Sequence, residues 1–438
     1  MARKKPANAP ARDPGGPEPA KRPGRVRRFF DELGPGLITG AADDDPSGIS
    51  TYSVAGASFG YAPLWTALFS FPLMTAVQLM CARLGMVSGR GLAGVIRHRY
   101  SRGVLWMACA LLIVANVINI GADLGGMAAA TAMVTGVPAA AWAPLYAGFI
   151  VSLLFWSSYR QIARIFKWLT LVLFAYVATA FLARPDWSAV LGATLLPQIQ
   201  WSNDYLAVFV GILGTTISPY LFFWQAAQEV EQDRAAGRRT LRQRRGATAF
   251  ELARARNDVI TGMFFSNFVM FFIILTTAST LHAHGQTSIA TARQAAEALR
   301  PLAGDAAYWL FALGLIGTGM LGVPVLAGSS AYAVAEAEGW RGSLDDRPRL
   351  ARRFYAVVAV SLLVGLGLDY FGFDAVGMLF WCAVVNGVLA APLVVLVVLL
   401  TSDRSVMGEW VNPPLLRGLG WLTAVVMSAA AIAMFFAG

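Results

Sequence analysis

The feature that most constrains this chain is a series of apolar segments, each long enough to cross a lipid bilayer. A membrane-spanning helix needs about 20 apolar residues to cross roughly 30 Å of hydrocarbon. Eleven segments qualify: 34–58, 62–87, 104–131, 138–158, 161–183, 205–228, 257–281, 305–335, 353–370, 374–401 and 414–437. The chain is 57% hydrophobic and 14% charged, whereas soluble domains are about 25% charged. We therefore predict an all-α membrane protein with about eleven transmembrane helices.

The basic residues alternate between successive connections. The N-terminal tail and every second connection, beginning with the one between the second and third segments, together hold 32 of the 35 Lys and Arg residues. The remaining connections hold only Arg184, Arg293 and Arg300. Basic loops favour the cytoplasmic side of a membrane. We therefore expect a multi-pass protein of the cell membrane with a cytoplasmic N-terminus. This asymmetry also accounts for the net charge of +10 without a nucleic-acid partner.

The chain divides into a short tail and one membrane domain. Residues 1–30 are rich in Pro, Gly, Lys and Arg and lack an apolar run, so they predict a disordered basic tail in the cytoplasm. Residues 31–438 form the predicted transmembrane domain. Its cysteines Cys81, Cys109 and Cys382 lie in apolar runs without metal-ligand spacing, which favours buried structural residues.

The first apolar segment contains charges that lipid does not tolerate. Asp43, Asp44 and Asp45 stand in its middle, and each charge at the bilayer centre costs about 2.5–3.5 kcal/mol. They are expected to face protein, water or a cation. Pro46 removes a backbone donor, and Ser47 with the following glycine favours an irregular backbone. We predict an unwound stretch between two half-helices here.

The sixth apolar segment has a matching interruption. Pro219 follows Thr215 and Ser218 inside the segment 205–228. Interrupted helices at corresponding places in two halves are typical of inverted-repeat transporters that bind substrate at the midplane. The segments then group as a repeat over about 34–183, a second over about 205–401, and an extra helix over 414–437. Carboxylates and unwound carbonyls are ligands suited to hard cations.

Other polar residues inside the spans are weaker candidates. Asp123 in the third segment is a candidate pathway or proton-carrying residue, because isolated charges in membrane spans are usually functional. Asn116 and Asn119 in the same segment, and Asn386 in the tenth, are candidates for the pathway or for hydrogen bonds between helices.

These motifs resemble the NRAMP divalent-metal transporters, and more closely their NRAMP-related magnesium-transporter branch. The resemblance covers nearly the whole chain. Gly34-Pro35-Gly36 matches the family's first-helix GPG, and Asp45-Pro46-Ser47-Gly48 matches its Asp-Pro-Gly-Asn motif. Asp45 falls on the family's metal-binding aspartate, and Gly48 on its metal-binding asparagine.

The sixth and third segments carry the rest of the resemblance. Thr215 falls on the alanine whose carbonyl binds metal, and Ser218, Pro219 and Tyr220 fall on the family's Met-Pro-His motif. Asp123 matches a conserved aspartate of the third helix. The nearby glutamate of the family is replaced by glycine at position 126.

The departures from the family pattern suggest a hard cation. Methionine sulfur favours transition metals, so its replacement by Ser218 leaves an all-oxygen site, and Gly48 leaves space for a partly hydrated ion. The resemblance implies a site in which Asp45 binds Mg²⁺, or Mn²⁺ as a second substrate. Thr215 and Ser218 would supply further oxygens, and Asp43 and Asp44 would hold waters.

The loss of titratable partners at Tyr220 and Gly126 predicts alternating-access transport without proton coupling. No bound cofactor is expected besides the transported ion. The alternatives are a proton-coupled Mn²⁺ or Fe²⁺ importer, a sodium-coupled organic-solute symporter of the same fold, and a membrane sensor that signals through residues 229–256. The sequence contains no recognisable catalytic constellation, so we do not expect an enzyme. It makes no prediction of oligomeric state.

Overall fold

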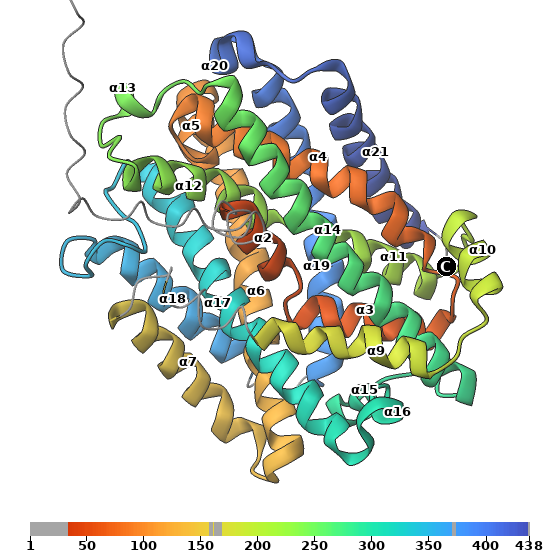
Figure 1. Cartoon of the computed structure of the whole chain (residues 1–438). Helices are drawn as coiled ribbons and strands as arrows, with labels where there is room; N and C mark the ends of the chain where they lie inside the picture. The colour runs from red at the N-terminus through yellow and green to blue at the C-terminus, as the bar shows by residue number, and fades with distance from the viewer. Residues whose placement is uncertain (1–33, 157–160, 162–168, 370–373, 437–438) are drawn as a thin grey trace, which may run out of the picture. The chain divides into compact units, whose positions relative to one another are not determined.

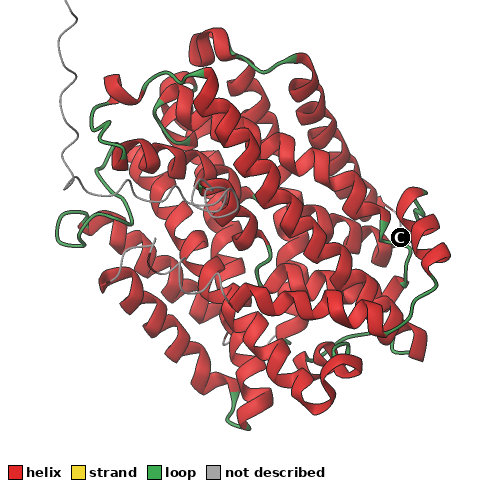
Figure 2. Cartoon of the chain, viewed as in Figure 1, coloured by secondary structure: helices red, strands yellow, loops and turns green. Residues whose placement is uncertain are grey.

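The computed structural model describes residues 34–156, 161, 169–369 and 374–436. Within these ranges every regular element is a helix (Figure 2), and the prediction of an all-α protein is confirmed. The predicted tail over residues 1–30 lies outside the described residues.

Within the described residues, eight helical segments are long and apolar enough to cross a membrane. They contain α4 (Trp65–Ser88), α6 (Arg102–Thr135), α7 (Ala139–Trp156), α11 (Asn203–Thr216) with α12 (Pro219–Ala235), α14 (Ala249–Thr280), α17 (Ala307–Glu338), α19 (Ala375–Ser402) and α21 (Pro414–Phe436). The other three predicted spans correspond to α2 (Pro35–Asp43) with α3 (Pro46–Phe59), to η1 (Leu169–Leu173) with α9 (Phe174–Leu182), and to α18 (Arg352–Asp369). The count of eleven spans therefore stays a prediction.

Shorter helices complete the chain between the spans. They are α5 (Leu92–Arg99), α10 (Trp187–Leu195), α13 (Leu241–Arg244), η2 (His282–His284), α15 (Ala292–Glu297), α16 (Arg300–Ala303), η3 (Gly304–Ala306), α20 (Arg404–Met407) and η4 (Gly408–Trp410). Because α12 continues to Ala235 and α14 begins at Ala249, residues 229–256 are mostly helix.

Two helices are broken in the membrane, as predicted. The first is interrupted between α2 and α3, and the sixth between α11 and α12. The breaks are narrower than expected. Pro46 and Pro219 each occupy the first turn of the following helix, where a missing N–H costs nothing. Ser47 also lies in the first turn of α3 instead of an unwound stretch.

The broken helices lie in the middle of the bundle (Figure 1). The half-helix α2 packs against α14 and α12, while α3 packs against α14, α19, α11 and α6. The contact between α2 and α14 is a backbone contact. A Cβ at Gly40 would lie 2.3 Å from the carbonyl oxygen of Gly262, so only glycine permits this approach.

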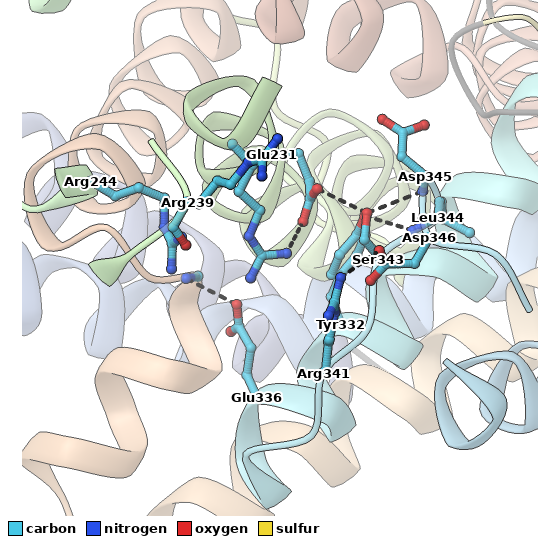
Figure 3. A network of polar contacts seen from close by, with 12 residues as sticks. Glu231, Arg239, Arg244, Tyr332, Glu336, Arg341, Ser343, Leu344, Asp345 and Asp346 are labelled. Atoms are coloured by element: carbon cyan, nitrogen blue, oxygen red, sulfur yellow. Dashed lines mark hydrogen bonds and ion pairs between the residues drawn. The ribbon is translucent and has the colours of Figure 1, made fainter. Parts of the chain in front are cut away.

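The described connections rich in Lys and Arg lie together at one end of the bundle, which we call the basic end. It comprises α5, α13, residues 339–351 and α20. Arg99 on α5 pairs with Asp403 beside α20 at 2.5 Å. Ser343 Oγ donates to Glu231 Oε2 on α12 at 2.8 Å, within the polar network of Figure 3. The assignment of this end to the cytoplasm stays a prediction.

Candidate metal-ion site

Asp45 lies at the break of the first helix and begins α3. Its Oδ1 accepts hydrogen bonds from Ser47 Oγ at 2.6 Å and from the backbone N–H of Gly48 at 2.9 Å. This is the geometry of an N-cap, in which a carboxylate satisfies the free N–H groups of a helix start. Only 2% of Asp45 is exposed. The local sequence therefore fixes this carboxylate at the break.

The second oxygen of Asp45 joins two other helices to the break. Asn119 Nδ2 on α6 lies 3.1 Å from Asp45 Oδ2, and the Tyr220 hydroxyl on α12 lies 3.3 Å from the same oxygen. The Tyr220 hydroxyl is also 2.9 Å from the carbonyl oxygen of Ala42, the next-to-last residue of α2. Tyr220 thus bridges both halves of the first helix from the second broken helix.

The other two aspartates point to a different neighbour. Ser266 on α14 donates to Asp43 Oδ2 and lies 3.3 Å from Asp44 Oδ1. The remaining oxygen of Asp43 has no hydrogen-bond partner among the described residues. Both carboxylates are buried. The three consecutive carboxylates therefore divide between two polar clusters, one at Asp45 and one at Ser266.

Thr215 and Ser218, the two predicted metal ligands of the sixth helix, are hydrogen-bonded to groups other than Asp45. Thr215 Oγ1 donates to the Ile212 carbonyl at 3.0 Å and lies 2.9 Å from the Tyr52 hydroxyl. Ser218 Oγ lies 2.6 Å from the Gly214 carbonyl and 2.7 Å from the Thr215 carbonyl. In this conformation the Ser218 hydroxyl turns back onto α11, so a role as an ion ligand needs a rotation of that side chain.

Asp123 lies near Asp45 but outside its hydrogen-bond ring. Its two carboxylate oxygens make no hydrogen bond of ordinary geometry with the described residues. Both aspartates face Gly322 on α17: a Cβ there would lie 3.1 Å from Asp45 Cβ and 3.6 Å from Asp123 Oδ2. Gly322 therefore lets α17 pass beside the two acids, and the buried oxygens of Asp123 are available to an arriving proton or cation.

The candidate asparagines have different partners. Asn119 contacts Asp45, while Asn386 lies only at a long 3.9 Å from Cys382 Sγ. Asn116 donates to the Leu326 carbonyl of α17 at 2.9 Å, which is a contact between helices. Cys382 is more than an apolar core residue, because its thiol lies 2.8 Å from Asn119 Oδ1.

This conformation holds the candidate site closed. The carboxylates of Asp45 and Asp123 are at most 2% exposed. Away from the basic end, a cavity of about 10 Å³ is lined by Ser50, Ser53 and Gly126 among others, which is room for about one water. Access to Asp45 therefore requires movement of the helices around it.

The chemistry around Asp45 suits a cation bound by one charged oxygen and several neutral groups. Among the described residues, no three His, Cys, Asp or Glu side chains converge on a point where they could hold a metal. A divalent ion beside Asp45 would complete its shell with neutral oxygens and water. Mg²⁺ and Mn²⁺ both accept such ligands.

Several residues of this region were missed in the sequence. Ser266 is one small polar residue in the run Phe264–Phe268 of α14, and Gly322 follows Gly317 and Gly319 on α17. The spacing of these glycines signals close helix contact. Nothing in the sequence indicates that this contact is with Asp45, and the neighbourhood of Cys382 had no sequence signal.

Comparison with known proteins shows the family and the fold. The profile of the natural resistance-associated macrophage protein-like (Nramp) family matches residues 36–437. The divalent metal cation transporter MntH of Deinococcus radiodurans is 30% identical over 419 residues, covering 93% of this chain and 90% of that protein. The same-named protein of Agrobacterium fabrum is 30% identical over 420 residues, covering 92% and 86%.

Solved structures share the arrangement of helices. A mutant of the Eremococcus coleocola manganese transporter superimposes with a TM-score of 0.71 at 20% identity, covering 95% of this chain and 88% of that one. Mhp1, a nucleobase-cation-symport-1 family transporter, superimposes with a TM-score of 0.54 at 15% identity, covering 92% of both chains. The magnesium-transporter branch stays a prediction. The resemblance to the family is confirmed, and the chain belongs to the NRAMP family of divalent metal cation transporters.

Proposed function

We propose that this protein carries a divalent metal cation across the cell membrane by alternating access, with Asp45 as the charged ligand. The observation that carries the proposal is the position of Asp45. A buried carboxylate caps one half of a broken helix and is reached by Tyr220 from the second broken helix. An ion bound there would join the two repeats at the midplane. In this proposal the basic end faces the cytoplasm.

We infer that Mg²⁺ is the favoured cation and that Mn²⁺ is also carried. Direct neighbours of Asp45 are the hydroxyls of Ser47 and Tyr220, the amide of Asn119 and a backbone N–H. Sulfur is absent from this set of described neighbours. Mg²⁺ keeps several waters and is often held by one or two carboxylates, which fits a single charged ligand among neutral groups. Asp43 and Asp44 would then hold waters only after moving from Ser266.

We also propose that transport is not coupled to protons. The partner of Asp45 on α12 is Tyr220, whose phenol does not titrate near neutral pH. The membrane potential alone supplies about 4.6 kcal/mol per 100 mV for a divalent ion, at about 2.3 kcal/mol per charge. A gradient of the ion and this potential would suffice to drive uptake.

A second candidate is proton-coupled transport of Mn²⁺ or Fe²⁺, and two observations favour it. The thiol of Cys382 lies 2.8 Å from Asn119, and Asn119 in turn contacts Asp45. A soft sulfur favours transition metals. The carboxylate oxygens of Asp123 accept no hydrogen bond of ordinary geometry among the described residues, so Asp123 could take up a proton. Relatives named as MntH carry divalent metal cations. This similarity favours a metal ion as the substrate over the organic solute of the symporter alternative.

The deciding experiment measures flux of Mg²⁺, and separately of Mn²⁺, into proteoliposomes with an internal pH dye. Mg²⁺ influx without acidification is the expected result. Mn²⁺ influx with acidification and no Mg²⁺ flux would establish the second candidate instead. Asp45→Ala should abolish flux, whereas Asp43→Ala should only weaken it. Equal losses in the two variants would contradict the assignment of Asp45 as the direct ligand.

A further inference from the structure

A basic groove lies at the basic end, away from the metal-ion site. It has a volume of about 260 Å³. Its polar lining comes from three segments that are distant in the sequence: Ser88, Arg90, His98 and Arg99 around α5, Arg245 after α13, and Ser405 in α20. No Asp or Glu is among the described residues that line it. The groove is therefore a concave, positively charged surface with hydroxyl groups.

Two of its arginines form no ion pair with any described residue. Arg99 is neutralised by Asp403 at 2.5 Å. Glu336, an acid whose charge acts on Arg90, accepts the backbone N–H groups of Gly91 and Gly94, each at 2.9 Å. The guanidinium groups of Arg90 and Arg245 form no ion pair within the described part of the chain. Two positive charges without an ion-pair partner in the described part of the chain therefore line one groove.

The two arginines are close enough to repel each other. Burial lowers the pKa of Arg90, and the positive charge of Arg245 lowers it further, while Glu336 acts in the opposite direction. The loop that carries Arg245 is held in place, because the next residue, Gly246, donates its N–H to the Val87 carbonyl at 2.9 Å. The fold thus holds like charges together, which an anion between them would stabilise.

The remaining polar groups of the groove match a phosphate. The imidazole of His98 donates Nδ1–H to the Gly94 carbonyl at 2.8 Å, because a carbonyl can only accept. In this tautomer Nε2 carries a lone pair, so it donates to a phosphate oxygen only as the imidazolium. Arginine forks and hydroxyls are the usual donors to phosphate oxygens. A volume near 260 Å³ is below the roughly 300–1,000 Å³ of drug-sized pockets, so it fits a small phosphoester better than a whole nucleotide.

The groove lies where the membrane spans end. Ser88 is the last residue of α4, and Ser405 follows the end of α19 at Ser402 by three residues. This is the depth of lipid headgroups, and basic pockets between spans bind anionic headgroups. We propose that this groove is a binding site for a phosphate group, supplied by an anionic phospholipid headgroup or by free phosphate, with Arg90 and Arg245 as its charged ligands.

The test is a binding measurement on the full chain in a neutral detergent at constant ionic strength. Thermophoresis would record isotherms for dioctanoyl phosphatidylglycerol, for inorganic phosphate, and for dioctanoylglycerol, which has no phosphate. Binding of phosphatidylglycerol alone identifies a lipid site, and binding of both phosphate compounds identifies a site that also takes free phosphate. Failure of both phosphate compounds to bind, or equal binding of dioctanoylglycerol, would overturn the proposal.

Variants assign the binding to the groove. The double change Arg90→Gln and Arg245→Gln should weaken phosphate-dependent binding at least tenfold. Arg349→Gln, at an exposed arginine of the same end outside the groove, should leave it unchanged. Ser405→Asp adds a negative charge to the groove and should weaken binding even if the double variant does not fold. Unchanged affinity in a folded double variant, or in Ser405→Asp, would refute the site.

Discussion

The carboxylate of Asp258 holds the beginning of the half-helix α2 against α14. Its oxygens accept backbone N–H groups from Gly34 at 2.8 Å, Gly36 at 2.7 Å and Leu37 at 3.2 Å. A helix start has unsatisfied N–H groups, and a charged cap satisfies them. Because α2 ends at Asp43, beside the candidate metal-ion site, we expect Asp258 to control whether this half-helix stays closed.

The effect of Asp258→Ala follows from these contacts. Loss of a cap costs about 0.5–2 kcal/mol, and each buried N–H left without a partner costs about 1–3 kcal/mol. Water can reach part of this helix start, so we take about 2 kcal/mol as the change. That value corresponds to about a 30-fold shift toward local opening, at tenfold per 1.4 kcal/mol. The glycine contacts between α2 and α14 remain, which limits the change to α2.

Hydrogen–deuterium exchange of the purified protein measures this opening directly. Peptides within residues 34–43 should exchange about 30-fold faster in Asp258→Ala, and Asp258→Asn should be intermediate because its amide retains one acceptor oxygen. The matched control is Asp305→Ala, at a side chain that is 91% exposed. Unchanged exchange over α2 would refute the role of Asp258, and equal acceleration in α4 would mean general destabilisation instead.

Three further outcomes are expected. Gly40→Ala should lower stability by about 1–3 kcal/mol, because its Cβ would lie 2.3 Å from a backbone oxygen; thermal unfolding measures this, with Gly418→Ala, which has open space, as the unaffected control. The hydrogen bond from Arg99, together with hydrogen bonds from the start of α20, lowers the pKa of Asp403. The ionised carboxylate therefore stabilises the folded protein fully above the unfolded-state pKa of about 3.9. This stabilisation is lost as the pH falls through the lower pKa of the folded state. The difference in Tm between wild type and Arg99→Gln should therefore be constant above pH 5 and should shrink as the pH falls below about 3.9. A Tm difference that persists at pH 2 would contradict this. Cys382→Ala should reduce the flux of Mn²⁺ relative to Mg²⁺ if its sulfur contributes to metal choice, and equal flux ratios would exclude that contribution.

The breaks in the helices could be predicted because their causes are local. Pro46 and Pro219 lack the N–H that a continuing helix needs, and the charges before Pro46 cannot face lipid. The width of the breaks could not be predicted in this way. Each proline fits the first turn of a new helix, so the chain recovers helical geometry after two residues. Tertiary contacts, which sequence patterns do not reveal, decide how far a helix unwinds.

The division of the three carboxylates follows from helix geometry. Successive helical residues are about 100° apart around the axis, at 3.6 residues per turn. Asp43 ends α2 and Asp45 caps α3, so their side chains leave the chain in different directions. A shared ion would require a longer unwound stretch than the structure has. The partner of Asp43 and Asp44, Ser266, lies more than 200 residues away in the sequence, and only the fold brings it there.

The neighbours of Asp45 explain how one site can serve both parts of a transport cycle. When no cation is bound, Ser47, Asn119 and the N–H of Gly48 stabilise its negative charge as donors, and the Tyr220 hydroxyl shares its one proton between Asp45 and the Ala42 carbonyl. The two hydroxyls and the amide also carry oxygen lone pairs. Rotation of these side chains would turn donors to an anion into ligands of a cation, while the Gly48 N–H still holds the carboxylate. A second fixed carboxylate would lack this property, because two buried like charges destabilise the site whenever the ion has left.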